Sequence, residues 1–190
     1  GQFSATNDKG STSKKGVPNL YEPIDLVSMA LQLGASFVAR SFSGDKAQLV
    51  PLIKAALKHK GMAFIDVISP CIAFNNHSGS TKSFEFVREH TSSVVNADLI
   101  FGQPEITADY AEGTQENVAM PDGSTLQLYK IDANYDPHDR IGAMTYVQQM
   151  QEQGQVATGL LYVDPDALEC HDIMETTARP LNELTEETLC

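Results

Sequence analysis

The sequence lacks a run of apolar residues long enough to cross a bilayer, which takes about 20 residues. Its first residues also lack the charged-then-apolar pattern of a secretion signal. The chain begins at Gly1 without a methionine, and we expect it to be a fragment or a trimmed chain. These absences predict a protein with no membrane partner.

Cysteine is scarce, and its three positions, Cys71, Cys170 and Cys190, include no CxxC pair. Three scattered thiols are too few for a disulfide framework, and an odd number without a signal segment predicts a reducing, cytoplasmic location. They are also too few for a four-cysteine metal site built from this chain alone.

Positive charge is scarce in the second half of the chain. Residues 96–190 hold three Lys/Arg against eighteen Asp/Glu, whereas residues 1–95 hold ten against seven, so −15 and +3 sum to the net charge of −12. This balance argues against nucleic-acid binding. An acidic partner would prefer the first half, and the alternative is that the acidic half is simply a solvated surface.

The order of apolar segments predicts an α/β fold. Residues 35–40 and 62–68 have the pattern of strands, and a helix between them begins near Gly44 and ends at Gly61. Strand, helix and strand in this order form the βαβ unit of a parallel sheet. A helix at 23–33 precedes the unit. Pro51 lies within the second helix, so this helix either begins near Val50 or is kinked.

The second half predicts a hairpin, a helix and a further strand. Apolar residues at 118–120 and 126–129 flank an Asp-Gly turn, in a stretch from 97 to 131 that is otherwise irregular. A helix follows at about 138–153 and a strand at 156–163. We predict three segments: residues 1–72, an extension at 73–140, and a final helix, strand and acidic tail at 141–190.

Cys71 follows the strand at 62–68, where open α/β sheets bind ligands. Such a thiol is either buried and inert or a ligand of a soft metal together with thiolates from elsewhere. Asn75, Asn76 and His77 are either a turn cluster or the polar lining of a cofactor crevice. The lysines of the Gly/Ser-rich loop are either solvated or a patch for phosphates or an acidic partner; they are Lys9, Lys14 and Lys15.

Five separated motifs share one family resemblance. They stand at residues 1–6, 37–40, 64–71, 74–77 and 80–83. In this order and spacing they resemble the β subunit of 2-oxoacid:ferredoxin oxidoreductases, in particular its 2-oxoglutarate and broad 2-oxoacid branch. The resemblance is strong up to about residue 90 and looser beyond.

The resemblance implies a fold and a cofactor set. The fold is the C-terminal part of a parallel-sheet domain that binds thiamine diphosphate, followed by a family-specific extension with the hairpin. The implied cofactors are thiamine diphosphate, Mg²⁺ and a [4Fe–4S] cluster. Cys71 would be one of four cluster ligands, the other three lying upstream in the family. Gly1 and Gln2 would belong to the edge of the diphosphate loop, and Asn75 and Asn76 would line the crevice.

The resemblance also implies a reaction and partners. Such a subunit acts with an α subunit to convert a 2-oxoacid, here 2-oxoglutarate, to acyl-CoA and CO₂, with coenzyme A as acyl acceptor and ferredoxin as electron acceptor. As these 190 residues stand, we expect them to be inactive alone. Two alternatives stay open: a non-catalytic α/β interaction module that keeps the fold, and a thiamine-dependent enzyme without a cluster.

Overall fold

The computed structural model describes residues 3–12, 16–69, 76–100, 115–119, 125–130, 132 and 134–175. The helices in these ranges are α1 (Leu26–Gln32), α2 (Lys46–Lys58), α3 (Phe84–His90), α4 (Arg140–Glu152) and α5 (Cys170–Ile173). The strands are β1 (Phe37–Phe42), β2 (Ala63–Ile68), β3 (Thr91–Ile100), β4 (Gln115–Ala119), β5 (Thr125–Lys130) and β6 (Val156–Val163). None of the described helices has the length and apolar character needed to span a bilayer.

The described strands form one mixed sheet in the order β2-β1-β6-β3-β5-β4. β1 is parallel to β2 and β3 is parallel to β6, whereas the other neighbours are antiparallel. Because β6 runs against β1, the carboxyl ends of β1 and β2 lie at the same edge of the sheet as the amino ends of β3 and β6. We call this the strand-end edge.

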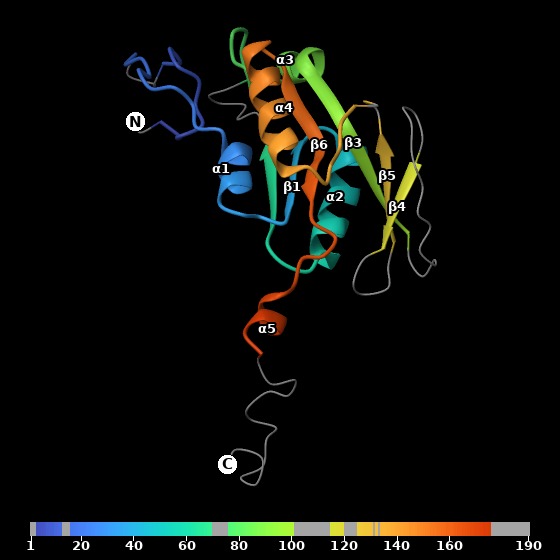
Figure 1. Ribbon diagram of the computed structural model, residues 1–190. Coiled ribbons are helices and arrows are strands. Elements are labelled where there is room, and N and C mark those ends of the chain that lie inside the picture. The colour runs from blue at the N-terminus through green and yellow to red at the C-terminus, as the bar shows by residue number, and fades with distance from the viewer. Residues whose placement is uncertain are drawn as a thin grey trace, which may run out of the picture.

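Helices cover both faces of the sheet around β1 and β6 (Figure 1). α1 and α4 contact each other and pack on one face, and α2 packs on the other. Side chains alternate between the two faces along a strand, so two neighbouring residues of β1 contact helices on opposite faces. Arg40 contacts Asp25 at the start of α1, whereas Ser41 donates a hydrogen bond to Gln48 of α2. β1 is therefore buried over its whole length.

The predicted βαβ unit is confirmed, with a shifted first helix. β1 pairs in parallel with β2, and α2 connects them. The helix expected at 23–33 begins at Leu26, because the Asp25 carboxylate accepts a hydrogen bond from the Ser28 amide at 3.0 Å and caps it there. Gly34 follows the helix with a φ of 88°, the left-handed conformation typical of a glycine that ends a helix.

α2 begins at Lys46, which confirms the predicted start near Gly44 and excludes the alternative start near Val50. The helix starts earlier because the Asp45 carboxylate accepts a hydrogen bond from the Gln48 amide at 3.1 Å. Pro51 consequently lies in the helix interior, where its missing N–H leaves one carbonyl of the preceding turn without its helical donor.

In the second half the predicted hairpin, helix and last strand are present. β4 and β5 pair antiparallel, as the hairpin requires, and the Asp122-Gly123 pair between them lies outside the described residues. α4 begins after Asp139, whose carboxylate accepts a hydrogen bond from the Ile141 amide at 3.0 Å. β6 has the predicted bounds. It lies between β1 and β3, so elements of all three predicted segments share one sheet; the division at residues 72 and 140 stays a prediction.

β3 is the strand that the sequence does not predict. Its polar residues obscure the apolar alternation that identifies a half-buried strand. In the fold these groups have partners. The Ser93 hydroxyl lies 3.2 Å from the Thr158 hydroxyl on β6, and it accepts a hydrogen bond from the side-chain amide of Gln48 at 3.0 Å. A polar strand can therefore be central because its hydroxyls are satisfied inside the sheet.

Candidate functional site

The strand-end edge is the candidate functional site. β1 and β2 pair in register from Phe37–Ala63 to Phe42–Ile68, so both strands end at the same level. The amino end of α3 reaches this edge too, where the Phe84 ring meets that of Phe42 edge-on at a centroid distance of 5.0 Å. Loops from distant parts of the sequence therefore meet where α/β sheets bind ligands.

Most predicted site residues lie outside the described residues. These are Gly1, Gln2, Cys71 and Asn75. The chain is described up to Ser69, one residue past β2, so Cys71 follows two residues later along the sequence. Its role as a cluster ligand therefore stays a prediction.

Asn76 is described, is exposed, and has a structural contact. Its side-chain oxygen accepts a hydrogen bond from the Phe84 amide at 3.1 Å, while the Ser83 hydroxyl accepts one from the Phe86 amide at 3.2 Å. Together they satisfy two amide groups at the start of α3. Asn76 thus fixes the loop that follows the candidate site, and its contact with a cofactor stays a prediction. His77 contacts only its own turn among the described residues, through Ser78 O at 2.9 Å.

Asp8 ties the N-terminal loop to the loop before α3. Its carboxylate accepts hydrogen bonds from the Thr81 hydroxyl at 2.6 Å, the Thr81 amide at 2.9 Å and Lys82 Nζ at 2.7 Å. Burial raises the pKa of Asp8, but these hydrogen bonds and the Lys82 charge outweigh it and hold the pKa below its usual value. Buried Asn19 braces the same loop by donating to the carbonyls of Asn7 and Asp8. The sequence analysis did not identify Asp8.

Replacing Asp8 with Asn is expected to release the N-terminal loop. The variant loses the ion pair with Lys82, and we expect the free energy of unfolding to fall by about 1 kcal/mol, with a several-fold faster tryptic cut after Lys9. The control is Glu22→Gln, which breaks the exposed 2.5 Å pair with Lys9 in the same loop and should change stability by less than about 0.5 kcal/mol. Equal cleavage rates in Asp8→Asn and wild type would show that Asp8 does not hold the loop.

Arg40 joins β1, β2 and α1 beneath the strand-end edge. Its Nε donates to the Asp66 carboxylate at 2.9 Å, and its terminal nitrogen donates to Asp25. Arg40 is 6% exposed, and Asp66 is its direct register partner on β2. Burial raises the pKa of Asp25, but attraction to Arg40 and hydrogen bonds from Ser28 and Arg40 lower it overall. One buried cation thus balances two carboxylates. A charged residue inside each of two apolar strands is the sequence signal that could have identified this cluster.

Replacing Arg40 with Met is expected to lower the free energy of unfolding at neutral pH by about 3 kcal/mol, because two part-buried carboxylates lose their cation. In the wild type, the lowered pKa of Asp25 stabilises the fold above its usual value of 3.8, and this contribution is lost as the pH falls through the lower folded-state pKa. Without Arg40, burial raises the pKa, so the variant should lose less stability on acidification. Urea unfolding from about pH 3 to pH 7 measures this.

The control for Arg40→Met is Lys60→Met, which removes a half-exposed ion pair with Asp172 at 3.5 Å. It should cost less than about 1 kcal/mol. If Arg40→Met and the wild type lost stability in parallel on acidification, the charge balance assigned to Arg40 would be wrong.

Gln48 anchors α2 to three neighbouring strands. It accepts a hydrogen bond from Ser41 on β1 at 2.9 Å and donates to Ser93 on β3 at 3.0 Å and towards Thr158 on β6 at 3.5 Å. A cavity of about 290 Å³ opens beside it at the strand-end edge, and Arg88 of α3 contributes to its lining. The network fixes α2 across the sheet, because these three side-chain hydrogen bonds join the helix to hydroxyls of β1, β3 and β6.

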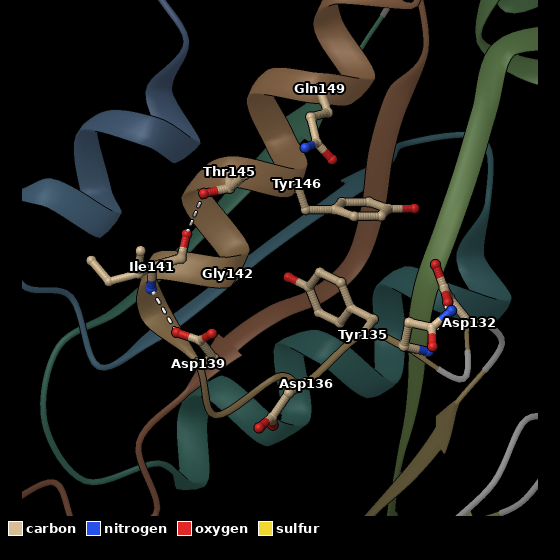
Figure 2. Close-up of a pocket in the computed structure, with 10 residues that line it drawn as sticks. Asp132, Tyr135, Asp136, Asp139, Ile141, Gly142, Thr145, Tyr146 and Gln149 are labelled. Atoms are coloured by element: carbon tan, nitrogen blue, oxygen red, sulfur yellow. Dashed lines mark hydrogen bonds between the residues drawn. The ribbon is translucent and has the colours of Figure 1, made fainter.

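A larger cavity of about 500 Å³ lies on the α4 face (Figure 2). Tyr135 and Tyr146 meet there edge-on at a centroid distance of 4.9 Å, and the Tyr135 hydroxyl donates to the Leu161 carbonyl at 2.5 Å. Burial raises the pKa of Tyr135 far above its usual value, and nearby Tyr146, Asp136 and Asp139 raise it further. Tyr135 therefore stays protonated and structural. This cavity lies near the carboxyl end of β6, at the opposite edge from the candidate site.

The described residues do not fit a complete metal centre. Within the described ranges no three His, Cys, Asp or Glu side chains converge to hold a metal ion. Cys170 is the sole cysteine in these ranges, and it is exposed on α5. A [4Fe–4S] cluster takes several thiolates, so the described part of the chain does not supply the full ligand set of the cluster.

Comparison with a family model confirms the predicted fold of the first part of the chain. Residues 1–67 match the C-terminal TPP-binding domain of thiamine pyrophosphate enzymes. This stretch ends within β2, so it contains the βαβ unit almost complete, together with Arg40 and Asp66.

The resemblance to 2-oxoacid:ferredoxin oxidoreductase β subunits is confirmed as well. The chain is 40% identical over 77 residues to the 2-oxoacid:ferredoxin oxidoreductase subunit beta of a Sulfolobus species, covering 40% of this chain and 25% of the relative. It is 31% identical over 104 residues to the 2-oxoglutarate oxidoreductase subunit KorB of Mycobacterium tuberculosis, covering 54% and 28%. The match thus spans about a quarter of the length of these relatives.

A solved structure extends the likeness of the fold to nearly the whole chain. It is a 2-oxoglutarate:ferredoxin oxidoreductase from Magnetococcus marinus with 2-oxoglutarate, coenzyme A and succinyl-CoA bound. The TM-score is 0.60 at 20% sequence identity, over 95% of this chain and 53% of that one. At this identity the likeness concerns the fold, and it includes the second half, where the match in sequence is looser.

Proposed function

We propose that the chain is part of the β subunit of an oxidoreductase that decarboxylates a 2-oxoacid, with 2-oxoglutarate as the first candidate, and transfers the acyl group to coenzyme A. Ferredoxin is the proposed electron acceptor. The observation that carries the proposal is the coincidence of three boundaries. The match to TPP-binding domains ends at residue 67, and the βαβ unit ends at Ile68, the last residue of β2. The Ser69-Pro70-Cys71 motif begins at the next residue.

Thiamine diphosphate supplies the electron sink for decarboxylation in such enzymes, with Mg²⁺ as its companion ion. In the proposal, this chain forms one wall of the cofactor site. The Arg40–Asp66 pair fixes the register of β1 and β2, so that both strands end at the same level. Asp8 and Asn76 hold the loop that follows, and the residues proposed to contact the cofactor are Gly1, Gln2, Asn75 and Asn76.

Cys71 is the proposed protein ligand of a [4Fe–4S] cluster within this chain. In the proposal its three partner thiolates lie upstream of these 190 residues, as they do in the family; Cys170, the one cysteine among the described residues, is exposed on α5. The proposal includes an α subunit that completes the active site, and a cytoplasmic location, as a reduced cluster ligand requires.

The test is an activity assay on the natural full-length protein, produced without oxygen together with its candidate α subunit. We expect ferredoxin reduction that depends on both 2-oxoglutarate and coenzyme A, and one bound thiamine diphosphate for each β subunit. A complex that binds thiamine diphosphate but contains no iron would favour a cluster-free thiamine enzyme. A complex that binds neither would favour a non-catalytic interaction module. Either result would overturn the proposal.

A further inference from the structure

The outer face of α2 combines apolar and basic residues. Val50, Ile53 and Leu57 follow the spacing of one helical stripe and are 44%, 40% and 80% exposed. Three lysines flank the stripe: Lys46, Lys54 and Lys58. Gln48, Leu52 and Ala55 on the opposite side pack against the sheet, so the outer residues take no part in the core. We call the three exposed apolar residues and the three lysines together the α2 outer face.

Such a face fits an acidic segment with apolar anchors. Exposed apolar residues at helical spacing bind an amphipathic partner, and lysines around them favour carboxylates. Among the described residues, Lys46 and Lys54 form no ion pair, so both charges are available for a partner.

Residues 176–190, which lie outside the described residues, have the complementary chemistry. They contain Leu181, Leu184 and Leu189, together with three glutamates against one arginine. The glutamates are Glu183, Glu186 and Glu187. Leucines and glutamates alternate in short steps, so one extended or helical run can present both to the same surface.

The described chain ends beside α2. Asp172 on α5 lies 3.5 Å from Lys60, which follows α2 by two residues, and Glu175 comes three residues later. In Figure 1, α5 lies below the lower end of α2. α2 is about 20 Å long, whereas 15 extended residues reach about 50 Å. The segment therefore starts at the right place and is long enough to follow the whole helix.

We propose that residues 176–190 of the same chain dock on the α2 outer face, with leucines against Val50, Ile53 and Leu57 and glutamates at the lysines. The acidic second half thereby covers part of the basic first half. This contact is independent of the proposed activity.

The test is zero-length carbodiimide cross-linking of the full-length protein at low concentration, read by mass spectrometry. We expect amide links from Glu183, Glu186 or Glu187 to lysines of the α2 outer face in the monomeric fraction. The structural pairs Lys82–Asp8 and Lys60–Asp172 are the positive controls. If the control links form and the links to α2 do not, the proposal is wrong. Links confined to the dimeric fraction would instead assign the face to a second copy, which also overturns it.

A matched pair of variants tests the apolar part of the contact. Leu57→Asp should reduce the yield of these links about tenfold, because it places a charge in the stripe. Leu33→Asp is the control, since Leu33 follows α1 and is similarly exposed, at 74% against 80%. It should leave the yield unchanged. Equal yields in both variants would overturn the docking of the leucines.

Discussion

Replacing Gly159 with alanine is expected to lower the free energy of unfolding by more than about 4 kcal/mol, a large part of the 5–15 kcal/mol that stabilises an ordinary domain. Gly159 lies in β6 with a φ of 101°, a conformation that L side chains rarely adopt. An added Cβ would stand 2.1 Å from the Val95 carbonyl oxygen of β3. Neither strand can yield easily, because β6 is bonded on its other side to β1, where Gly159 pairs with Arg40.

The same position explains why glycine is needed there. The register of β3 and β6 shifts between Ser93 and Val95, so β3 has one extra residue opposite Gly159. Such a bulge brings the two backbones together, and only a residue without a side chain allows that approach. Because β6 joins the βαβ unit to the second half of the sheet, loss of this contact should unfold both parts together.

Gly154→Ala is the matched control for Gly159→Ala. Gly154 also has a positive φ, of 70°, but an added Cβ there would meet no atom within 4 Å. We expect it to cost about 1 kcal/mol from backbone strain alone. Urea unfolding followed by circular dichroism, with soluble yield as a second readout, measures both variants. A Gly159→Ala protein as stable as Gly154→Ala would contradict the close approach of β3 and β6.

The sequence predicts the first half of the fold well, because local and global signals agree there. Two apolar β-branched segments with a capped helix between them have few arrangements other than a βαβ unit. β3 illustrates the opposite case. Its serines become strand residues only because Thr158 and Gln48 satisfy them, and these partners come from 65 and 45 residues away. No local pattern contains that information.

The candidate site was predictable in position rather than in detail. A strand that ends before Cys71 identifies the ligand-binding edge of a sheet, and this placement follows from topology. Asp8 could not be identified from the sequence, because its structural role depends on contacts with Thr81 and Lys82, which lie more than 70 residues later in the chain. Asn76 shows that a polar residue at such an edge can be used for capping a helix. Residue type alone does not separate that use from ligand binding.

Replacing Cys71 with alanine in the complete α–β complex is expected to have the largest effect on function. Under the proposed function a [4Fe–4S] cluster held by four thiolates would lose one ligand, so we expect the iron and acid-labile sulfide content to fall at least about tenfold. Ferredoxin reduction should fall with it, since the electrons then lack their acceptor within the protein. The fold should persist, because Cys71 follows the last residue of β2 by three positions in the sequence.

Cys170→Ala is the control for this experiment. Cys170 is an exposed thiol on α5, with Met174 as its described contact, and its loss should leave the iron content unchanged. The decisive measurement is therefore iron and sulfide per β subunit in the wild-type, Cys71→Ala and Cys170→Ala complexes, purified without oxygen. The assignment of this strand end as a cluster-binding edge predicts about four irons in the wild type and in Cys170→Ala, and nearly none in Cys71→Ala. A full iron content in Cys71→Ala would contradict it.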